Sequence, residues 1–460
     1  MFDNQPNMSE STIDTSSTTA LPGKIVIIYS LGQAGWSLAS YNVGTLLTYF
    51  YAPPELGKAT FPNFLPSFIF FGLTILGVLA SVGRLYDAFI DAFIANVSDK
   101  TVSRFGKRRI FMGISALPLA ALSFLIFYPP VSAMSDTNVW WLGCCLFFYY
   151  IFYSMYIIPY TALISELGKD EKDRLRISTG VALAWGFGFL LGNLTPALQS
   201  LLEKTGIIPL AAFQTVVFSL AIVALALMII PVLFLDENKY SSGVTSSSES
   251  FVKSFRSVLS FAPFRIFALS YLIYWLALTI IQAGMIYYVT LIFGMDKSVA
   301  TLFGGISFLG SFAFYPFINK LAQRYSKKRL LLVGYIVFCC VFALMLAPIP
   351  SGIRFCLVAV LASYPLAVFG ILPNAVVGDI VQNRLQKTGI NQSGMFFAVA
   401  SFVVKIGSSI SNLIFPSLLK LGKSIENYNG VTYSILLAIF FLASGYFVFR
   451  QYNEEEILNS

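Results

Sequence analysis

The chain has 460 residues, of which 57% are hydrophobic, 16% aromatic and only 11% charged, with a mean hydropathy of +0.76. Soluble domains carry about a quarter charged residues, so this composition excludes a water-soluble globular protein. The sequence contains no histidine, which removes the commonest metal ligand and the usual general base near neutral pH. We therefore expect an integral membrane protein that is not an enzyme and needs no cofactor.

The apolar runs fall into two groups of six, and each run is long enough for a membrane span of about 20 residues. Residues 1–22 are polar and predicted to form a disordered tail, 236–263 a linker between the groups, and 451–460 a second tail. The N-terminal bundle is expected over 23–235 and the C-terminal bundle over 264–450. The predicted spans are 25–51, 65–97, 110–128, 139–167, 177–202, 207–235, 266–293, 299–321, 330–348, 353–377, 394–421 and 431–449.

The distribution of basic residues predicts the orientation. Lysines and arginines concentrate in the tails and in the even-numbered connections, as in Lys107, Arg108 and Arg109, while the odd-numbered connections hold few. By the positive-inside rule, both termini and the linker face the cytoplasm, and we expect a multi-pass protein of the plasma membrane. Because topology accounts for the net charge of +8, nucleic acid is not an expected partner.

An internal repeat supports two equivalent halves. The segment 158–163, IPYTAL, has its counterpart in 372–377, LPNAVV, and the spacing from Pro159 to Pro373 equals that from Gly180 to Gly394. Each half has an even number of spans, so the halves point the same way across the membrane. The predicted fold is therefore an all-α integral membrane protein of the major facilitator type, with twelve transmembrane helices in two parallel six-helix repeats and the substrate path between them.

Four ionisable residues are predicted to lie at membrane depth, where each costs about 2.5 to 3.5 kcal/mol on insertion scales. Arg84, Asp87 and Asp91 share one face of the second span, and Lys405 lies in the eleventh. A cation held by the two carboxylates would compete with Lys405 and so couple ion binding to the packing of the two halves. Sodium or lithium would need several oxygen ligands and a proton only one carboxylate. A static ion-pair network is the alternative.

The segment 83–109, GRLYDAFIDAFIANVSDKTVSRFGKRR, resembles the second span and following loop of the glycoside–pentoside–hexuronide:cation symporters, the melibiose permease-like branch of the major facilitators. The resemblance extends to 158–163 and to 388–405. It implies that Asp87 and Asp91 are the paired cation-site carboxylates, that Lys405 approaches them and that Ser154 supplies a hydroxyl ligand. Arg84 is placed with Lys405 in the coupling network. A departure from the family pattern is Ile90, where the family has a polar residue.

Further departures concern the substrate. The sugar-binding carboxylates of the family are replaced by Ser37 and Ile157, and the expected aromatic platform by Thr161. We expect a cation-coupled symporter of a small solute, a sugar or glycoside, working by alternating access. A lipid or amphiphile carrier on the same fold and a membrane receptor that transports nothing are the alternatives.

Polar and aromatic residues along the first, fourth and fifth spans could line the substrate path. Besides the three positions above, these candidates are Trp36, Tyr41, Tyr160 and Trp185. Aromatic faces combined with hydroxyls suit a sugar, although ordinary helix packing would use the same residue types.

The basic loop after the second span has two interpretations. It could only set the topology, or Arg104, Lys107 and Arg108 could form a cytoplasmic gate with Glu166 and Asp379, at equivalent ends of the fourth and tenth spans. The expected partners of the protein are thus a small solute, Na+, Li+ or a proton, and the lipid bilayer, and the protein is expected to be a monomer.

Overall fold

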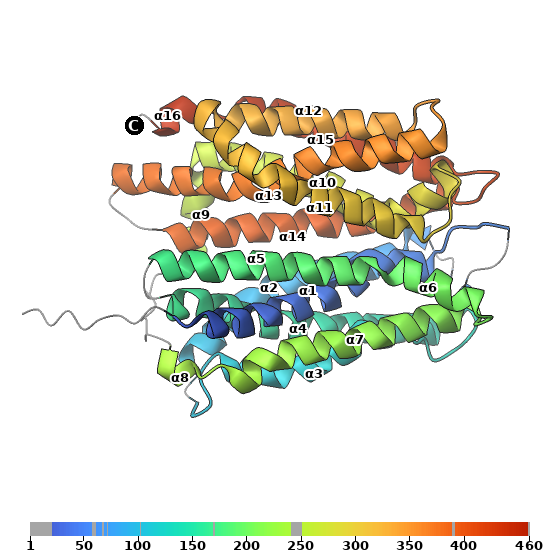
Figure 1. Cartoon of the computed structure of the whole chain (residues 1–460), viewed down its shortest axis with the longest axis horizontal. Coiled ribbons are helices and arrows are strands. Elements are labelled where there is room, and N and C mark those ends of the chain that lie inside the picture. The colour runs from blue at the N-terminus through green and yellow to red at the C-terminus, as the bar shows by residue number, and fades with distance from the viewer. Residues whose placement is uncertain are drawn as a thin grey trace, which may run out of the picture.

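The computed structural model describes residues 21–57, 61–66, 69–70, 72–101, 103–168, 171–240, 251–388 and 392–458. Long helices run side by side along one direction (Figure 1). The first half contains α1 Gly23–Tyr51, α2 Ile75–Lys100, α3 Arg109–Leu125, α4 Asp136–Leu167, α5 Glu171–Asn193, α6 Thr195–Lys204 and α7 Pro209–Phe234. The linker holds α8 Glu237–Tyr240 and α9 Phe251–Ser260. The second half contains α10 Ala262–Tyr287 with the π-helical turn η1 Tyr288–Ile292, α11 Val299–Arg324, α12 Lys327–Met345, α13 Ser351–Thr388, α14 Ser393–Leu418 with the 3₁₀ turn η2 Leu419–Leu421, α15 Asn429–Arg450 and α16 Glu454–Leu458.

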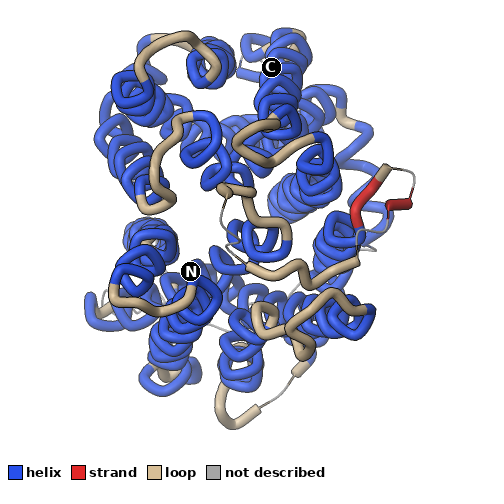
Figure 2. Tube along the Cα trace, turned by 90° about the vertical axis from the view of Figure 1, so that its right-hand side faces the viewer, coloured by secondary structure: helices blue, strands red, loops and turns tan. Residues whose placement is uncertain are grey.

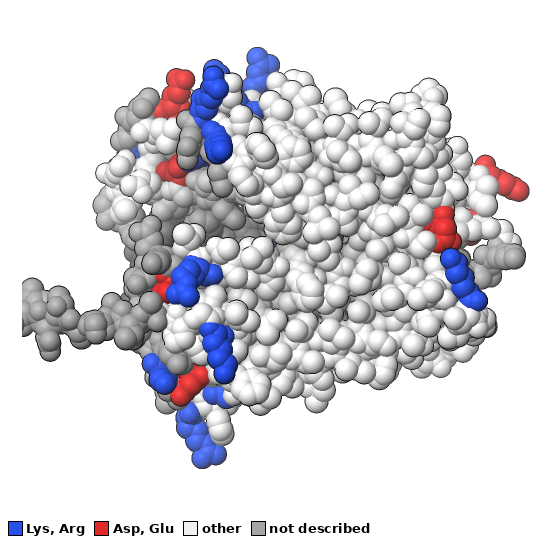
Figure 3. Space-filling model, viewed as in Figure 1, with Lys and Arg blue, Asp and Glu red and all other residues white. Residues whose placement is uncertain are grey.

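Among the described residues, 9 helical segments are long and apolar enough to cross a membrane. The 17-residue α3 is a shorter apolar helix, and α1 and α2 lie alongside with more polar or charged residues. Together they make up the expected twelve spans. Charged side chains cluster at the two ends of the molecule, and a broad uncharged band separates them on the face seen in Figure 3. This distribution is that of a protein whose middle is solvated by lipid.

The helices form two bundles that meet along one seam. In the first half α1 packs against α5 and α7, and in the second α10 packs against α15 and α14. The main contact between the halves is α2 against α14, and α5 and α6 also touch α11. Figure 2, which looks along the helix axes, shows the helices end-on around this seam.

Several predicted boundaries need correction. The second span was expected from residue 65, but α2 begins at Ile75, where the Thr74 hydroxyl accepts a hydrogen bond from Gly77 N at 3.2 Å. A short antiparallel pair, β1 (Ile69–Phe70) and β2 (Leu73–Thr74), precedes it. The tenth span was expected to end at 377, but α13 continues to Thr388.

The predicted tails and linker are partly outside the described residues, which exclude 1–20, 241–250, 389–391 and 459–460. Within the described part, Leu21 is buried and its backbone N–H donates to Asp173 Oδ2 at 2.8 Å, so the ordered chain begins before residue 23. The predicted linker and C-terminal tail also contain helices, namely α8, α9 and α16.

Candidate functional site

The seam between α2 and α14 is built by small residues. A Cβ atom on Gly77 of α2 would lie only 2.8 Å from the backbone oxygen of Leu413 on α14, so only glycine permits this approach. One turn further, the hydroxyls of Ser81 and Ser409 are 2.8 Å apart. The two backbones are therefore close where the ionisable residues follow.

The four intramembrane charges meet on this seam. Lys405 Nζ lies 2.8 Å from Asp87 Oδ2 and 2.5 Å from Asp91 Oδ2. Arg84 Nη1 lies 3.1 Å from Asp87 Oδ2. Asp87 is fully buried, while the Asp91 side chain is 23% exposed. Two acids and two bases thus form one cluster whose charges cancel, and the lysine from the second half contacts both carboxylates of the first.

Ser154 of α4 joins the two carboxylates. Its Oγ lies 2.7 Å from Asp87 Oδ1 and 2.7 Å from Asp91 Oδ1. A hydroxyl carries one hydrogen, so it can donate to only one of the two oxygens. The second short oxygen–oxygen contact is tolerated because positive charge lies close to both carboxylates, here on Lys405 Nζ. Carboxylate and hydroxyl oxygens are also the ligands that a hard cation takes.

An aromatic wall extends from this cluster. The Arg84 guanidinium lies 5.9 Å from the ring centre of Tyr150 and 5.7 Å from that of Tyr153, within cation–π range. Trp36 of α1 packs on Tyr153 with ring centres 4.8 Å apart. The charged cluster is therefore in contact, through two rings, with the first helix.

Three predicted substrate residues lie in helix packing instead. Ser37 Oγ donates to the Trp185 carbonyl at 2.8 Å, Tyr41 OH donates to Asn193 Oδ1 at 3.2 Å, and Tyr160 OH donates to the Tyr29 carbonyl at 2.8 Å. All three side chains are buried. Their hydroxyls join α1 to α5 and α4, so they are not available to a solute in this conformation.

The other predicted substrate residues are more exposed. Trp36 is partly buried, Thr161 is exposed, and Trp185 is 39% exposed and packs near Phe308 of α11. Ile157 is partly buried against the core. Of the predicted set, the two tryptophans thus present the largest accessible aromatic surface.

Four of the predicted gate residues form ion pairs within their own half of the molecule. Glu166 Oε1 accepts from Arg108 Nε at 3.1 Å and pairs with Lys107 Nζ at 3.2 Å, as the sequence predicted. Asp379, by contrast, pairs with Lys327 at 2.5 Å. In this conformation α13 packs against α12 of its own half. A gate between Asp379 and the loop of Arg104, Lys107 and Arg108, which would form when this end closes, stays a prediction. Arg104 lies over the ring of Phe105 at 4.9 Å.

The halves are tied together at the opposite end, a feature that the sequence did not reveal. Tyr287 OH lies within hydrogen-bonding distance of the carbonyls of Thr48 (3.1 Å) and Ala52 (2.7 Å), and Lys297 Nζ lies 2.5 Å from Glu203 Oε1. The chain around Glu55 also pairs with Ser424 in a parallel β-bridge. In the sequence, the only sign of this contact between the halves was that single charged residues occur in connections otherwise poor in charge.

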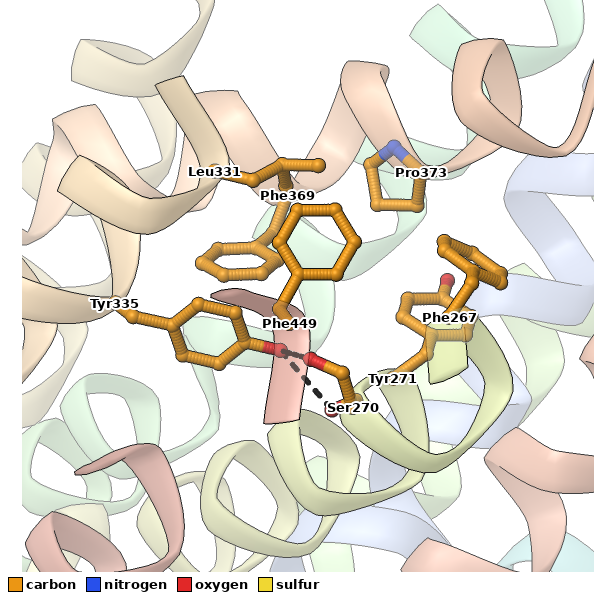
Figure 4. Close-up of a pocket in the computed structure, with 8 residues that line it drawn as sticks. All are labelled: Phe267, Ser270, Tyr271, Leu331, Tyr335, Phe369, Pro373 and Phe449. Atoms are coloured by element: carbon orange, nitrogen blue, oxygen red, sulfur yellow. Dashed lines mark hydrogen bonds between the residues drawn. The ribbon is translucent and has the colours of Figure 1, made fainter. Parts of the chain in front are cut away.

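Two cavities lie away from the charged cluster. One, of about 370 Å³, lies beside this closure and is lined by both halves, including Glu55, Asn63, Lys420 and Lys423. The other, of about 10 Å³, lies inside the second half, where Ser270 Oγ is 2.7 Å from Tyr335 OH (Figure 4). The second could hold at most about one water, which excludes it as a solute site.

A twelve-span bundle in two parallel halves, with an acid pair and a lysine on the seam between them, defines a secondary transporter of the major facilitator class. Residues 28–448 match the family described as MFS/sugar transport protein, and the chain belongs to it. The resemblance to the glycoside–pentoside–hexuronide:cation symporters is confirmed by the relatives below. These are transporters, and the expectation that the chain is not an enzyme is likewise confirmed.

The chain is similar over most of its length to named bacterial carriers. The uncharacterized symporter YnaJ of Bacillus subtilis is 24% identical over 400 residues, covering 84% of this chain and 80% of the relative. The glucuronide carrier protein homolog of Escherichia coli is 23% identical over 417 residues, covering 88% and 85%. The isoprimeverose transporter of Lactiplantibacillus pentosus is 23% identical over 407 residues, covering 87% and 80%.

Solved structures share the fold. The nucleoside transporter NupG superposes with a TM-score of 0.64 at 14% identity, covering 94% of this chain and 98% of that structure. A D-xylose–proton symporter gives the same TM-score, identity and coverage. At these identities the likeness concerns the fold alone.

Proposed function

We propose that this transporter moves a sugar or glycoside together with a monovalent cation or a proton that binds at Asp87, Asp91 and Ser154. The observation that carries the proposal is the pair of 2.7 Å contacts from Ser154 Oγ to the two carboxylates, which one hydroxyl hydrogen cannot satisfy. The two carboxylates and the hydroxyl place three oxygen ligands at one point, where Lys405 now supplies the positive charge and a cation or a proton could replace it.

Coupling follows from competition for the carboxylates. Lys405 belongs to α14 in the second half, while Asp87 and Asp91 belong to α2 in the first. A cation bound by the carboxylates weakens the attraction of Lys405 for them and so changes the contact between the halves. Alternating access requires the halves to move relative to each other, and the cation therefore biases that movement.

The substrate class rests on the relatives. Similar proteins include a glucuronide carrier homolog, an isoprimeverose transporter, a raffinose carrier and a lactose permease. These names favour a sugar over the lipid or amphiphile that was the alternative. The same proposal takes Na+, Li+ and the proton as the candidate coupling ions.

The test is uptake by proteoliposomes of lactose, raffinose, isoprimeverose and a methyl glucuronide, each under a sodium, lithium or proton gradient. We expect one gradient to drive accumulation of at least one sugar. Asp87→Asn and Asp91→Asn should abolish that accumulation and preserve exchange of the same sugar at equal concentrations on both sides. Asp136→Asn, an exposed acid at the start of α4, is the matched control. Full gradient dependence in both variants would reject the cation site.

We also propose a monomer in the plasma membrane with both termini in the cytoplasm, since the basic residues concentrate at that end. Fusing a reporter that is active only in the cytoplasm to each terminus tests the orientation. Activity of either fusion only outside the cell would reverse it. Light scattering of the detergent-solubilised protein measures the number of subunits, and a mass of two chains would reject the monomer.

A further inference from the structure

Two tryptophans occupy equivalent places in the two halves. Trp36 lies as many residues after the start of α1 at Gly23 as Trp275 lies after the start of α10 at Ala262. Each is followed one turn later by a hydroxyl, Ser40 in the first half and Thr279 in the second. The internal repeat thus places the same pair of groups on one helix of each half.

The closed end shows that these positions lie at similar depth. Thr48 and Tyr287 are also equivalent under the repeat, and they touch across the interface, with 3.1 Å between Tyr287 OH and the Thr48 carbonyl. Each tryptophan precedes its contact by the same stretch of helix, about 18 Å at 1.5 Å per residue. The two indoles therefore lie on α1 and α10 at the same distance beneath the closure, near the middle of the bundle.

Both tryptophans pack near the charged cluster of Arg84, Asp87, Asp91 and Lys405 without touching it directly in a contact recorded for the described residues. Trp36 packs on Tyr153, whose ring faces the guanidinium of Arg84 at 5.7 Å. Trp275 packs against α14, where a Cβ on Gly407 would lie 3.2 Å from the Trp275 Cβ. Gly407 is two residues from Lys405. Trp36 is thus separated from Arg84 by one ring, and Trp275 packs on the helix that carries Lys405.

Their polar atoms are unused. The indole N–H groups of Trp36 and Trp275 and the hydroxyl of Ser40 are covered, and none forms a hydrogen bond within the described part of the chain. The Tyr271 hydroxyl is close enough to Trp275 for an electrostatic interaction, but without hydrogen-bond geometry. A covered donor without an acceptor costs about 1 to 3 kcal/mol, so a bound acceptor would relieve that cost. Both rings are also partly exposed.

We propose that Trp36 and Trp275 form the sugar-binding platform, one indole from each half. A pyranose ring offers an apolar C–H face that can pack on the indole and hydroxyl oxygens that can accept from its N–H. The protein itself supplies no acceptor for either N–H group among the described residues. The platform takes over the role of the carboxylates that are replaced by Ser37 and Ile157. The inference rests on the proposed function, because it assumes a sugar substrate.

The test uses Trp36→Phe and Trp275→Phe, which keep a ring and remove the N–H. The readout is exchange of the panel sugar that the parent moves fastest, without any gradient. We expect the half-saturating sugar concentration to rise about five- to tenfold in each variant, as for the loss of one hydrogen bond. Trp36→Leu and Trp275→Leu should raise it further. Trp140→Phe is the matched control, since this indole is 76% exposed at one end of α4.

A second measurement tests the platform even if one of these variants fails to fold. In a protein whose other three tryptophans are phenylalanine, the same sugar should shield the emission of Trp36 and Trp275 from acrylamide. Half-saturation equal to that of Trp140→Phe, or unchanged quenching in the presence of the sugar, would overturn the platform. A parent that exchanges none of the sugars would instead reject the proposed substrate class. A parent that exchanges a sugar but accumulates none under a sodium, lithium or proton gradient would reject only the cation site.

Discussion

Ser154 differs from the other buried hydroxyls because both of its short contacts are to carboxylates. Ser115 and Ser123, for example, bond to backbone carbonyls of their own helix α3. Such bonds satisfy a hydroxyl locally, whereas Ser154 depends on what lies between Asp87 and Asp91. The proposed cation site therefore depends on a few atoms.

Removing this hydroxyl should weaken the cation site selectively. We expect Ser154→Ala to raise the half-activating cation concentration at least about tenfold, because hydrogen bonds to charged groups contribute about 1.5 to 3 kcal/mol. Ser154→Thr, which retains the hydroxyl, should behave like the parent. Uptake measured against cation concentration decides this, with Ser115→Ala as the control. Equal values for Ser154→Ala and Ser115→Ala would contradict a ligand role.

The burial of Lys423 at the closed end should make this closure depend on pH. Burial lowers the pKa of Lys423, although Glu55 nearby partly opposes this shift. The closed state therefore binds fewer protons at this site than an open state in which Lys423 is exposed. Raising the pH toward the ordinary lysine value of 10.5 should favour closure.

Labelling of Asn63→Cys in the adjoining cavity by an impermeant maleimide measures this closure. We expect its rate, relative to the same cysteine in a Lys423→Gln background, to fall as the pH rises. A ratio that stays constant or rises with pH would reject the effect.

At the scale of elements, the two halves use the same cap on equivalent helices. The Glu237 carboxylate accepts from the backbone N–H of Arg108 and of Arg109 at the start of α3, at 3.1 and 2.8 Å. Glu454 accepts from Lys327 N and Lys328 N at the start of α12, both at 2.9 Å. A carboxylate at a helix N-terminus satisfies free N–H groups and complements the helix dipole.

Loss of either cap should destabilise the protein. We expect Glu237→Ala and Glu454→Ala each to reduce the free energy of unfolding by about 1 to 2 kcal/mol. Thermal unfolding in detergent measures the change as a lower Tm. Glu455→Ala, which alters the exposed neighbour of Glu454, is the control and should leave the Tm unchanged. A Tm in either cap variant equal to that control would show that the contact is dispensable.

The sequence predicted what is local and missed what depends on distant partners. Arg84, Asp87 and Asp91 share a face because their spacing determines it, and Lys405 was expected to approach them from the balance of intramembrane charges and from the family resemblance. The start of α2 was placed ten residues early, because the residues that form β1 and β2 are as apolar as a span. Tyr41 was assigned to the substrate path, since nothing in the chain predicts that Asn193 would accept its hydrogen bond.

At the scale of the whole molecule, the two halves touch along the α2–α14 seam, between α5 and α11, and at one end. Opening that end must break the Lys297–Glu203 pair and the hydrogen bonds of Tyr287. At the other end, Glu166 pairs with Lys107 and Asp379 with Lys327, each within one half. The conformation is thus one of the two states that alternating access requires.

Charge reversal should shift this equilibrium. We expect Lys297→Glu, opposite Glu203, to open the closed end and to raise maleimide labelling of Thr48→Cys severalfold. The double variant Glu203→Lys, Lys297→Glu should restore the parent rate, because it restores the pair. Lys204→Glu, an exposed neighbour, is the control. Failure of the double variant to reduce labelling would show that the pair does not hold the end closed.

The cancelling charges of Arg84, Lys405, Asp87 and Asp91 have an electrical consequence. The empty carrier is neutral at its seam, so a carrier loaded with one cation and a neutral sugar holds one positive charge. Moving that charge fully across 100 mV changes the free energy by about 2.3 kcal/mol, roughly a fiftyfold bias toward the negative side. Uptake of a neutral sugar should therefore generate a current, whereas a sugar acid, whose own carboxylate cancels the ion, should cross without one.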